Sequence, residues 1–317
     1  MPQAITQRLE SLACRKNETW QGGLLRLPIW VEDDSGRPFR PWIAAWVSLR
    51  TGLTAVSEPA ARHELGPARL LALLEEFAGD TARAGYLPGT LVVRGSELAE
   101  AVRRGVPAGR IRVLVDESAA LSAPLAACLE PFREEERLDG ALEQPGMDPG
   151  VLRAFADAAC RFYRAAPWQR LTDQDLLRVG RPTAGGLPAH LVVLGAAGID
   201  RGAFFFTSAE AHRHLGQGGL GALMEAGESC WLITFSPIHE LPISDADLFE
   251  DLDLPVAAAA AYPVALAFEG GVHLRRLEGR ELAWVADLLT VLAEGSWSPD
   301  GRTLRGRVGD RDYRLSM

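Results

Sequence analysis

The sequence predicts a protein of the mixed α/β (α+β) class that is built from two tandem domains. Its 317 residues leave room for two domains of ordinary size. Apolar runs typical of strands alternate with segments whose apolar residues recur at helical spacing, and the order β-β-α-β-α-β-α occurs twice. We therefore expect α/β domains over residues 1–140 and 141–317, each a mixed sheet flanked by helices, and a C-terminal β-hairpin.

Composition excludes several classes of protein. Hydrophobic residues make up 47% and charged residues 24%, which is typical of globular chains and not of disordered ones. A net charge of −9 argues against nucleic acid as a partner. The four cysteines lie far apart, and the N-terminal residues lack the apolar stretch of a signal peptide. The sequence predicts a soluble protein of the cytoplasm with no membrane association.

The first half begins with strands and continues as alternating helices and strands. Three apolar runs separated by Gly, Pro and Asp fill residues 20–57. A proline followed by leucines at helical spacing predicts a helix over residues 67–77. The elements expected after it are a strand at 90–93, a helix at 96–104, a strand at 110–115 and a helix at 123–137.

A stretch rich in Pro and Gly, residues 139–150, predicts a linker, and Asp148-Pro149 predicts the start of a helix. The second half then repeats the first. We expect a hairpin at 191–198 and 202–208, a helix at 208–215, a strand at 231–235, a helix at 244–252, a strand at 263–268 and a helix at 280–294. The final hairpin turns at Gly309-Asp310. An internal duplication explains the repeated order, and chance in an α/β protein of this size is the alternative.

A glycine run, residues 216–221, has the spacing G-x-G-x-x-G of dinucleotide-binding loops. It follows a helix and not a strand, so helix capping and a loop explain it better. We expect no cofactor.

Histidines and carboxylates gather in the second half. His212 and His214, with His190 and His239, could ligate a metal, but residues two apart on a helix point in different directions. The acidic run 244–253 could bind a cation, but Ser244 and Asp247 also have capping-box spacing, and Asp245 suits the first turn of the helix, at the positive end of its dipole. A solvated helix face and a capped helix are the simpler interpretations, so we expect no metal.

Two places could bind a ligand. Trp42 and Trp46 share one face of a strand, where their rings could stack on a ligand or fill the core. Ser236, His239 and Glu240 lie in a Pro-containing loop after a strand, where binding residues often occur. The hypothesis is that this loop and residues 195–202 flank the largest pocket, with His239 inside it. Exposure of His239 and Glu240 to solvent is the alternative.

Three segments resemble a bacterial family of uncharacterised two-domain proteins. They are YRAAPWQRLTDQDLLRV, LVVLGAAGIDRGAFFF and FSPIHELPISDADLFEDLDLP, within residues 160–295. The first half, with GRPFRPWIAAWVSLRTG, resembles a companion domain that precedes it. The resemblance implies the division into two domains and no activity.

No G-x-S-x-G or H-E-x-x-H motif occurs. The sequence thus favours a non-catalytic binding or accessory module for a protein or small ligand. A hydrolase or metal-dependent enzyme that uses the histidines and carboxylates of the second half is the alternative. Nothing in the sequence indicates an oligomeric state.

Overall fold

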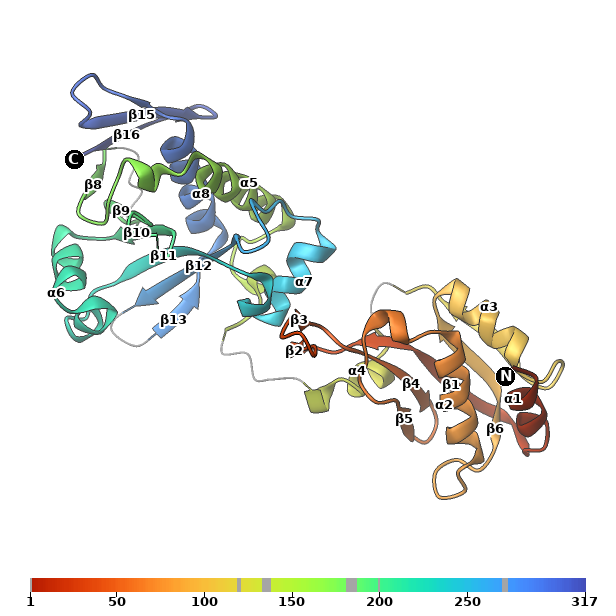
Figure 1. Cartoon of the computed structure of the whole chain (residues 1–317). Helices are drawn as coiled ribbons and strands as arrows, with labels where there is room; N and C mark the ends of the chain where they lie inside the picture. Colours follow the sequence, from red (N-terminus) through yellow and green to blue (C-terminus); the bar gives the residue numbers. More distant parts are fainter. Residues whose placement is uncertain (1, 119–120, 133–137, 181–186, 199, 270–272) are drawn as a thin grey trace. The chain divides into compact units, whose positions relative to one another are not determined.

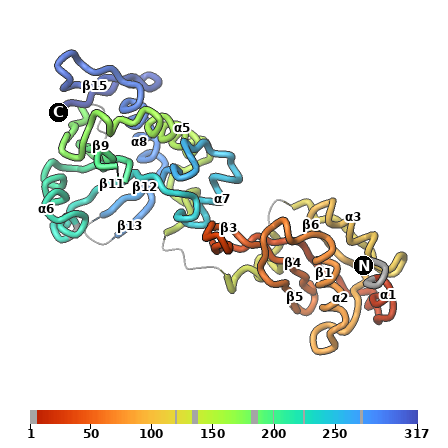
Figure 2. Tube along the Cα trace, viewed as in Figure 1, coloured from red at the N-terminus to blue at the C-terminus, as the bar shows by residue number. Residues whose placement is uncertain are grey.

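The structure is a computed structural model, and it describes all residues except 1, 119–120, 133–137, 181–186, 199 and 270–272. The chain divides into two compact units, residues 1–135 and 136–317, called here the N-terminal and C-terminal units. Figure 2 shows the path of the chain through each of them. Helices and strands are combined in both units, which confirms the α/β (α+β) class.

A five-stranded mixed sheet forms the centre of the N-terminal unit (Figure 1). Strands β1 and β4 are antiparallel, whereas β1, β6 and β7 run parallel to one another. In sheet order the strands are β5 (Thr54–Val56), β4 (Trp42–Ser48), β1 (Cys14–Arg26), β6 (Leu87–Arg94) and β7 (Arg112–Asp116), and β2 (Val31–Glu32) pairs with β3 (Pro38–Phe39) separately.

Both faces of this sheet carry apolar side chains that helices cover. One face packs with side chains of the first three helices around Trp20, Trp46 and Phe77. On the other face, the short fourth helix packs its Leu125 against β1 and β4. The helices are α1 (Pro2–Glu10), α2 (Pro67–Gly79), α3 (Ser96–Gly105) and α4 (Ala123–Ala127).

Helix α4 is shorter than the sequence suggested. The α-helix expected over 123–137 ends at Ala127 and is followed by a 3-10 turn, Glu130–Phe132. Pro131 lacks a backbone N–H and its ring would clash with the preceding turn, so an α-helix cannot continue through it unbroken. Residues 133–137 lie outside the described part of the chain.

A nine-stranded sheet forms the C-terminal unit, and every strand pairing described in it is antiparallel. The predicted C-terminal hairpin is present as its last two strands, which join the sheet through the pair Leu315 and Val179. In sheet order the strands are β13 (His273–Arg276), β12 (Tyr262–Glu269), β11 (Cys230–Ser236), β10 (Gly202–Phe206), β9 (His190–Leu194), β8 (Leu177–Val179), β16 (Arg311–Ser316), β15 (Thr303–Val308) and β14 (Ser296–Trp297).

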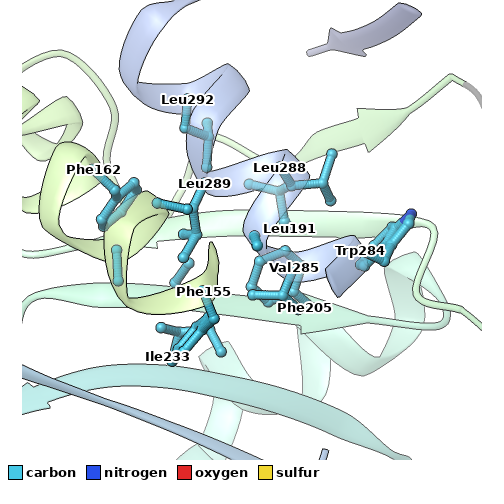
Figure 3. Packing of buried hydrophobic residues seen from close by; sticks show 14 of the residues in the cluster. Phe155, Phe162, Leu191, Phe205, Ile233, Trp284, Val285, Leu288, Leu289 and Leu292 are labelled. Carbon is cyan, nitrogen blue, oxygen red and sulfur yellow. The ribbon is translucent and has the colours of Figure 1, made fainter. Parts of the chain in front are cut away.

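Two long helices, α5 (Pro149–Ala165) and α8 (Gly279–Glu294), lie side by side on one face of this sheet (Figure 1). Asp148 caps α5 as predicted, since its Oδ1 accepts from the N–H groups of Gly150 and Val151 at 2.7 and 3.0 Å. Figure 3 shows the core that these helices form with the strands beneath them; its labelled residues are Phe155, Phe162, Leu191, Phe205, Ile233, Trp284, Val285, Leu288, Leu289 and Leu292.

The opposite face is covered by α6 (Ala209–Glu225), which includes the glycine run. Helical geometry is interrupted at Gly218 and Gly219. Gly219 has a φ of +67°, a left-handed conformation that glycine adopts readily. A second helical segment follows and buries Leu223 against the sheet. The run therefore interrupts a helix and does not connect a strand to a helix.

The two units share the predicted order of elements but pair their strands differently. After the β1–β4 hairpin and helix α2, strand β6 of the N-terminal unit pairs in parallel with the first hairpin strand, β1. The corresponding strand of the C-terminal unit, β11, pairs antiparallel with the second hairpin strand, β10. In the described residues, no helix is both long and apolar enough to cross a bilayer.

Candidate functional site

The two N-terminal tryptophans predicted as binding residues have different environments. Trp46 is 0% exposed, and its Nε1 donates to the carbonyl of Leu70 at 2.9 Å. Gly22 leaves room for its ring, because a Cβ there would lie 2.3 Å from it. Trp46 is therefore a core residue. Trp42 is half-buried under the guanidinium of Arg62, 5.3 Å from the ring centroid, and is the more accessible of the pair.

The loop after β11 holds the other predicted site residues. Ser236 is half-buried at the end of the strand, and His239 and Glu240 are exposed in a 3-10 turn, Ile238–Glu240. None of the three belongs to the lining of the cavity described below. Their role in binding stays a prediction.

The histidines of the second half have separate partners. His212 Nε2 lies 2.9 Å from the carbonyl oxygen of Asp173, and His214 Nε2 lies 3.7 Å from Glu210. Burial lowers the pKa of His190, and the nearby charges of Arg178 and His212 lower it further. Within the described residues, no three His, Cys, Asp or Glu side chains are arranged to hold a metal ion.

The buried thiol of Cys230 is a weak nucleophile at neutral pH. Its side chain lies in the core beneath α6, and this burial raises its pKa to about 12. Only the thiolate attacks an electrophile, so Cys230 supplies no reactive group to the described surface.

The acidic run, residues 244–253, contains Asp245, which the sequence predicted only as a carboxylate in the first turn of a helix. Helix α7 (Ile243–Asp251) begins after Pro242, whose carbonyl accepts from the N–H groups of Asp245 and Ala246 at 3.0 Å. Ser244 therefore lies inside the helix, and the predicted cap at Ser244 is wrong. Asp245 is in the first turn as expected, but its side chain is only 11% exposed and faces the interior.

Asp245 forms a buried ion pair with Arg276 of β13. Arg276 Nη1 donates to Asp245 Oδ2 at 2.5 Å, and the arginine side chain is 7% exposed. Arg276 Nε donates to the carbonyl of Asp139 at 2.6 Å. Nη2 of the same guanidinium is buried and has no hydrogen-bond partner among the described residues. Since a buried donor without an acceptor is destabilising, this nitrogen needs an explanation.

The ion pair lies in the wall of a cavity of about 50 Å³. Asp245 and Arg276 are its only charged lining residues in the described part of the chain; the other residues that line it are apolar and come from α5, α7, α8, β12 and the segments beside them: Ala141, Met147, Leu152, Phe155, Leu248, Phe249, Leu254, Pro263, Ala265 and Leu282. A single water needs about 10–15 Å³ of such space, so a small organic group of a few atoms fits.

The segment predicted as a linker forms one side of this cavity. Ala141 is buried in the core, and Met147 packs against it. The N–H of Gly279 donates to the carbonyl of Pro145 at 2.9 Å, and a Cβ on Gly279 would lie 1.8 Å from the carbonyl oxygen of Gly146. Residues 139–148 are therefore an ordered part of the C-terminal unit, because apolar contacts and hydrogen bonds to their backbone connect them to α8 and β13.

Sequence reasoning did not identify Arg276. The segment HLRR carries two adjacent arginines, and in a strand neighbouring side chains point to opposite faces, so one of them could have been expected to face inward. Arg275 binds Glu269 and Glu281 instead, at 2.7 Å. No local sequence pattern predicts the ion pair of Arg276 with Asp245, because Asp245 precedes Arg276 by 31 residues.

The cavity combines apolar walls with one buried ion pair, Asp245 and Arg276. Pockets of this composition, apolar with a few convergent polar groups, are typical of small-molecule sites. Comparisons of the chain with protein-family models, curated proteins and solved structures found no match.

Proposed function

We propose that the C-terminal unit is a non-catalytic binding module that holds a small, largely apolar ligand in the cavity beside Arg276. The observation that carries the proposal is an apolar cavity of about 50 Å³ whose lining includes Arg276, a residue whose Nη2 is buried and has no hydrogen-bond partner among the described residues. A ligand that brings an acceptor atom to this nitrogen would satisfy it and bury its own apolar groups among the lining side chains. An accessory or regulatory role suits such a module.

The alternative of a metal-dependent enzyme gains no geometric support from the described residues, in which no cluster of metal-ligating side chains occurs. A cytoplasmic setting is part of the proposal. Its support is the four free cysteines, three of them buried, since free thiols persist in reducing compartments.

A bacterial origin and an internal duplication are further parts of the proposal. The shared order of elements supports the duplication, and the different pairing of the third strand in each unit counts against it.

The test is a titration of the full chain with methyl isopropyl ketone, isobutyramide and isobutyrate, followed by backbone amide shifts in NMR spectra. The proposal predicts saturable shifts at residues of the cavity wall, such as Leu248 and Ala265, with at least one of the compounds. Absence of saturable shifts for all three compounds would refute the proposal.

Two variants make this test specific. Ala265→Leu places additional carbon atoms in the cavity and is expected to abolish the shifts, because Ala265 lines it. Leu274 is in β13, its side chain is 41% exposed, and it does not line the cavity. Leu274→Ser should therefore leave binding unchanged. Equal loss of binding in both variants would point to a general loss of structure and not to the cavity.

A further inference from the structure

The guanidinium of Arg276 has its donors arranged in a way that limits what can bind beside it. An arginine carries five N–H donors in a planar fork. Nε donates to the backbone of Asp139 at 2.6 Å and Nη1 to the carboxylate of Asp245 at 2.5 Å. Nη2 has no acceptor in the described part of the chain. A ligand atom that accepts a hydrogen bond from Nη2 would complete the hydrogen bonding of this guanidinium.

The charge of Arg276 is already neutralised by a carboxylate in direct contact. These are the only two charged side chains that the described residues contribute to the cavity wall. A second carboxylate on Nη2 would place two anions around one guanidinium among apolar side chains. Burial of an anion without its own counter-charge is strongly unfavourable, whereas a neutral carbonyl oxygen accepts the same hydrogen bond without adding charge.

The cavity walls determine the size and polarity of the remaining part of the ligand. Apart from the ion pair they are aliphatic or aromatic, with Leu152, Phe155, Leu248 and Leu282 among them, and the volume is about 50 Å³. A short, branched aliphatic group fills such a space and removes its apolar surface from water.

From these three features we infer that the ligand of this site is a small neutral carbonyl compound, whose oxygen accepts from Nη2 of Arg276 and whose short aliphatic body occupies the apolar cavity. This inference rests on the proposed binding function and specifies its chemistry. The carboxylate of Asp245 acts in it as the group that excludes anionic ligands.

The experiment compares methyl isopropyl ketone with isobutyrate at pH 7. The two have nearly the same shape and differ in charge. Dissociation constants are measured by NMR titration on the full chain and on the Asp245→Asn variant. We expect the ketone to bind the unchanged chain at least about tenfold more tightly than isobutyrate, a factor readily resolved by titration. In Asp245→Asn, which keeps the shape of the side chain and removes its charge, isobutyrate should gain affinity and the preference should reverse.

Equal or tighter binding of isobutyrate by the unchanged chain would overturn the inference and leave the binding function standing. So would a preference that is the same in Asp245→Asn. If isobutyramide also fails to bind together with these two compounds, the proposed function fails as well. Arg276→Met provides an independent test, because loss of the donor should weaken ketone binding. The NMR spectrum of this variant shows whether it is folded. Unchanged ketone affinity in the folded variant would also overturn the inference.

Discussion

Arg276 joins three segments of the C-terminal unit that lie far apart in the sequence. It is on β13 and contacts the carbonyl of Asp139 and the carboxylate of Asp245, and both charged side chains are nearly inaccessible to solvent. A buried ion pair is often no more stable than an apolar pair of the same size, but loss of one partner leaves the other charge buried and alone.

Arg276→Met should therefore lower the free energy of unfolding by about 3–5 kcal/mol, and Arg276→Met with Asp245→Leu should recover part of that loss. Urea denaturation of both single variants, Arg276→Met and Asp245→Leu, and of the double variant measures these quantities. Additive costs of the two substitutions would contradict the coupling of these side chains.

Tyr313 links stability to alkaline pH. Burial raises its pKa to about 12, and donation of its hydroxyl to Asp287 raises it as well. Between about pH 10, where a tyrosine in an unfolded chain titrates, and pH 12, the folded chain holds the proton and the unfolded chain has lost it. The contribution of Tyr313 to the free energy of unfolding should thus be constant below about pH 10. It should fall by about 2–3 kcal/mol between pH 10 and 12.

Tyr313→Phe removes this titration, so its unfolding free energy should decline less steeply over the same interval. Arg314→Gln, at an exposed position of the same strand, serves as the matched control, because glutamine does not titrate in this interval. Identical pH profiles for the original chain and Tyr313→Phe would contradict the assignment.

At the scale of single elements, two glycines at helical positions differ in the space around them. Gly279 begins α8 against the backbone of Gly146, where a Cβ would lie 1.8 Å from the carbonyl oxygen. Gly216 lies in α6 with open space around it. Gly279→Ala should therefore destabilise the C-terminal unit and displace residues 139–148, whereas Gly216→Ala should be neutral or stabilising by up to about 1 kcal/mol through helix propensity.

Thermal unfolding and proteolysis near residue 146 distinguish the two variants. Cleavage there should increase only in Gly279→Ala. Similar stability of both variants would show that the segment before α5 is not held by this contact.

Elements with strong local signals were predicted well, and those decided by contacts distant in the sequence were not. Asp148-Pro149 starts α5 because a cap and a proline act within one turn. The end of α4 before Pro131 and the start of α7 directly after Pro242 were both missed, since apolar residues and carboxylates at helical spacing suggested other bounds. Asp245 was recognised as a first-turn carboxylate, but its partner on β13 has no local signature.

At the scale of the whole chain, each unit has hydrophobic clusters of its own. Those of the N-terminal unit surround Trp46 and Leu125, and those of the C-terminal unit surround Phe205 and Phe206. The order of most strands could be predicted from apolar runs, but the strands β8, β13 and β14 were missed. The pairing of the strands could not be predicted, because a strand's neighbour is chosen by contacts far along the chain. The same order of elements accordingly yields a mixed sheet in one unit and antiparallel pairing in the other.

Because its core is its own, the fragment of residues 136–317 should fold without the N-terminal unit. We expect a cooperative thermal transition and a near-ultraviolet circular dichroism signal from its buried tryptophans, Trp231 and Trp284. A fragment that keeps its secondary structure but shows neither property would be a molten globule and would contradict separate cores.

If Arg276 binds a ligand in the apolar cavity, the NMR resonances of its own guanidinium nitrogens should respond to that ligand. These can be followed by NMR in the full chain, with the signal assigned by its loss in Arg276→Met, while methyl isopropyl ketone is added. We expect a saturable shift of the Arg276 signal that Ala265→Leu abolishes. An Arg276 signal that stays unchanged at saturating ketone would contradict it.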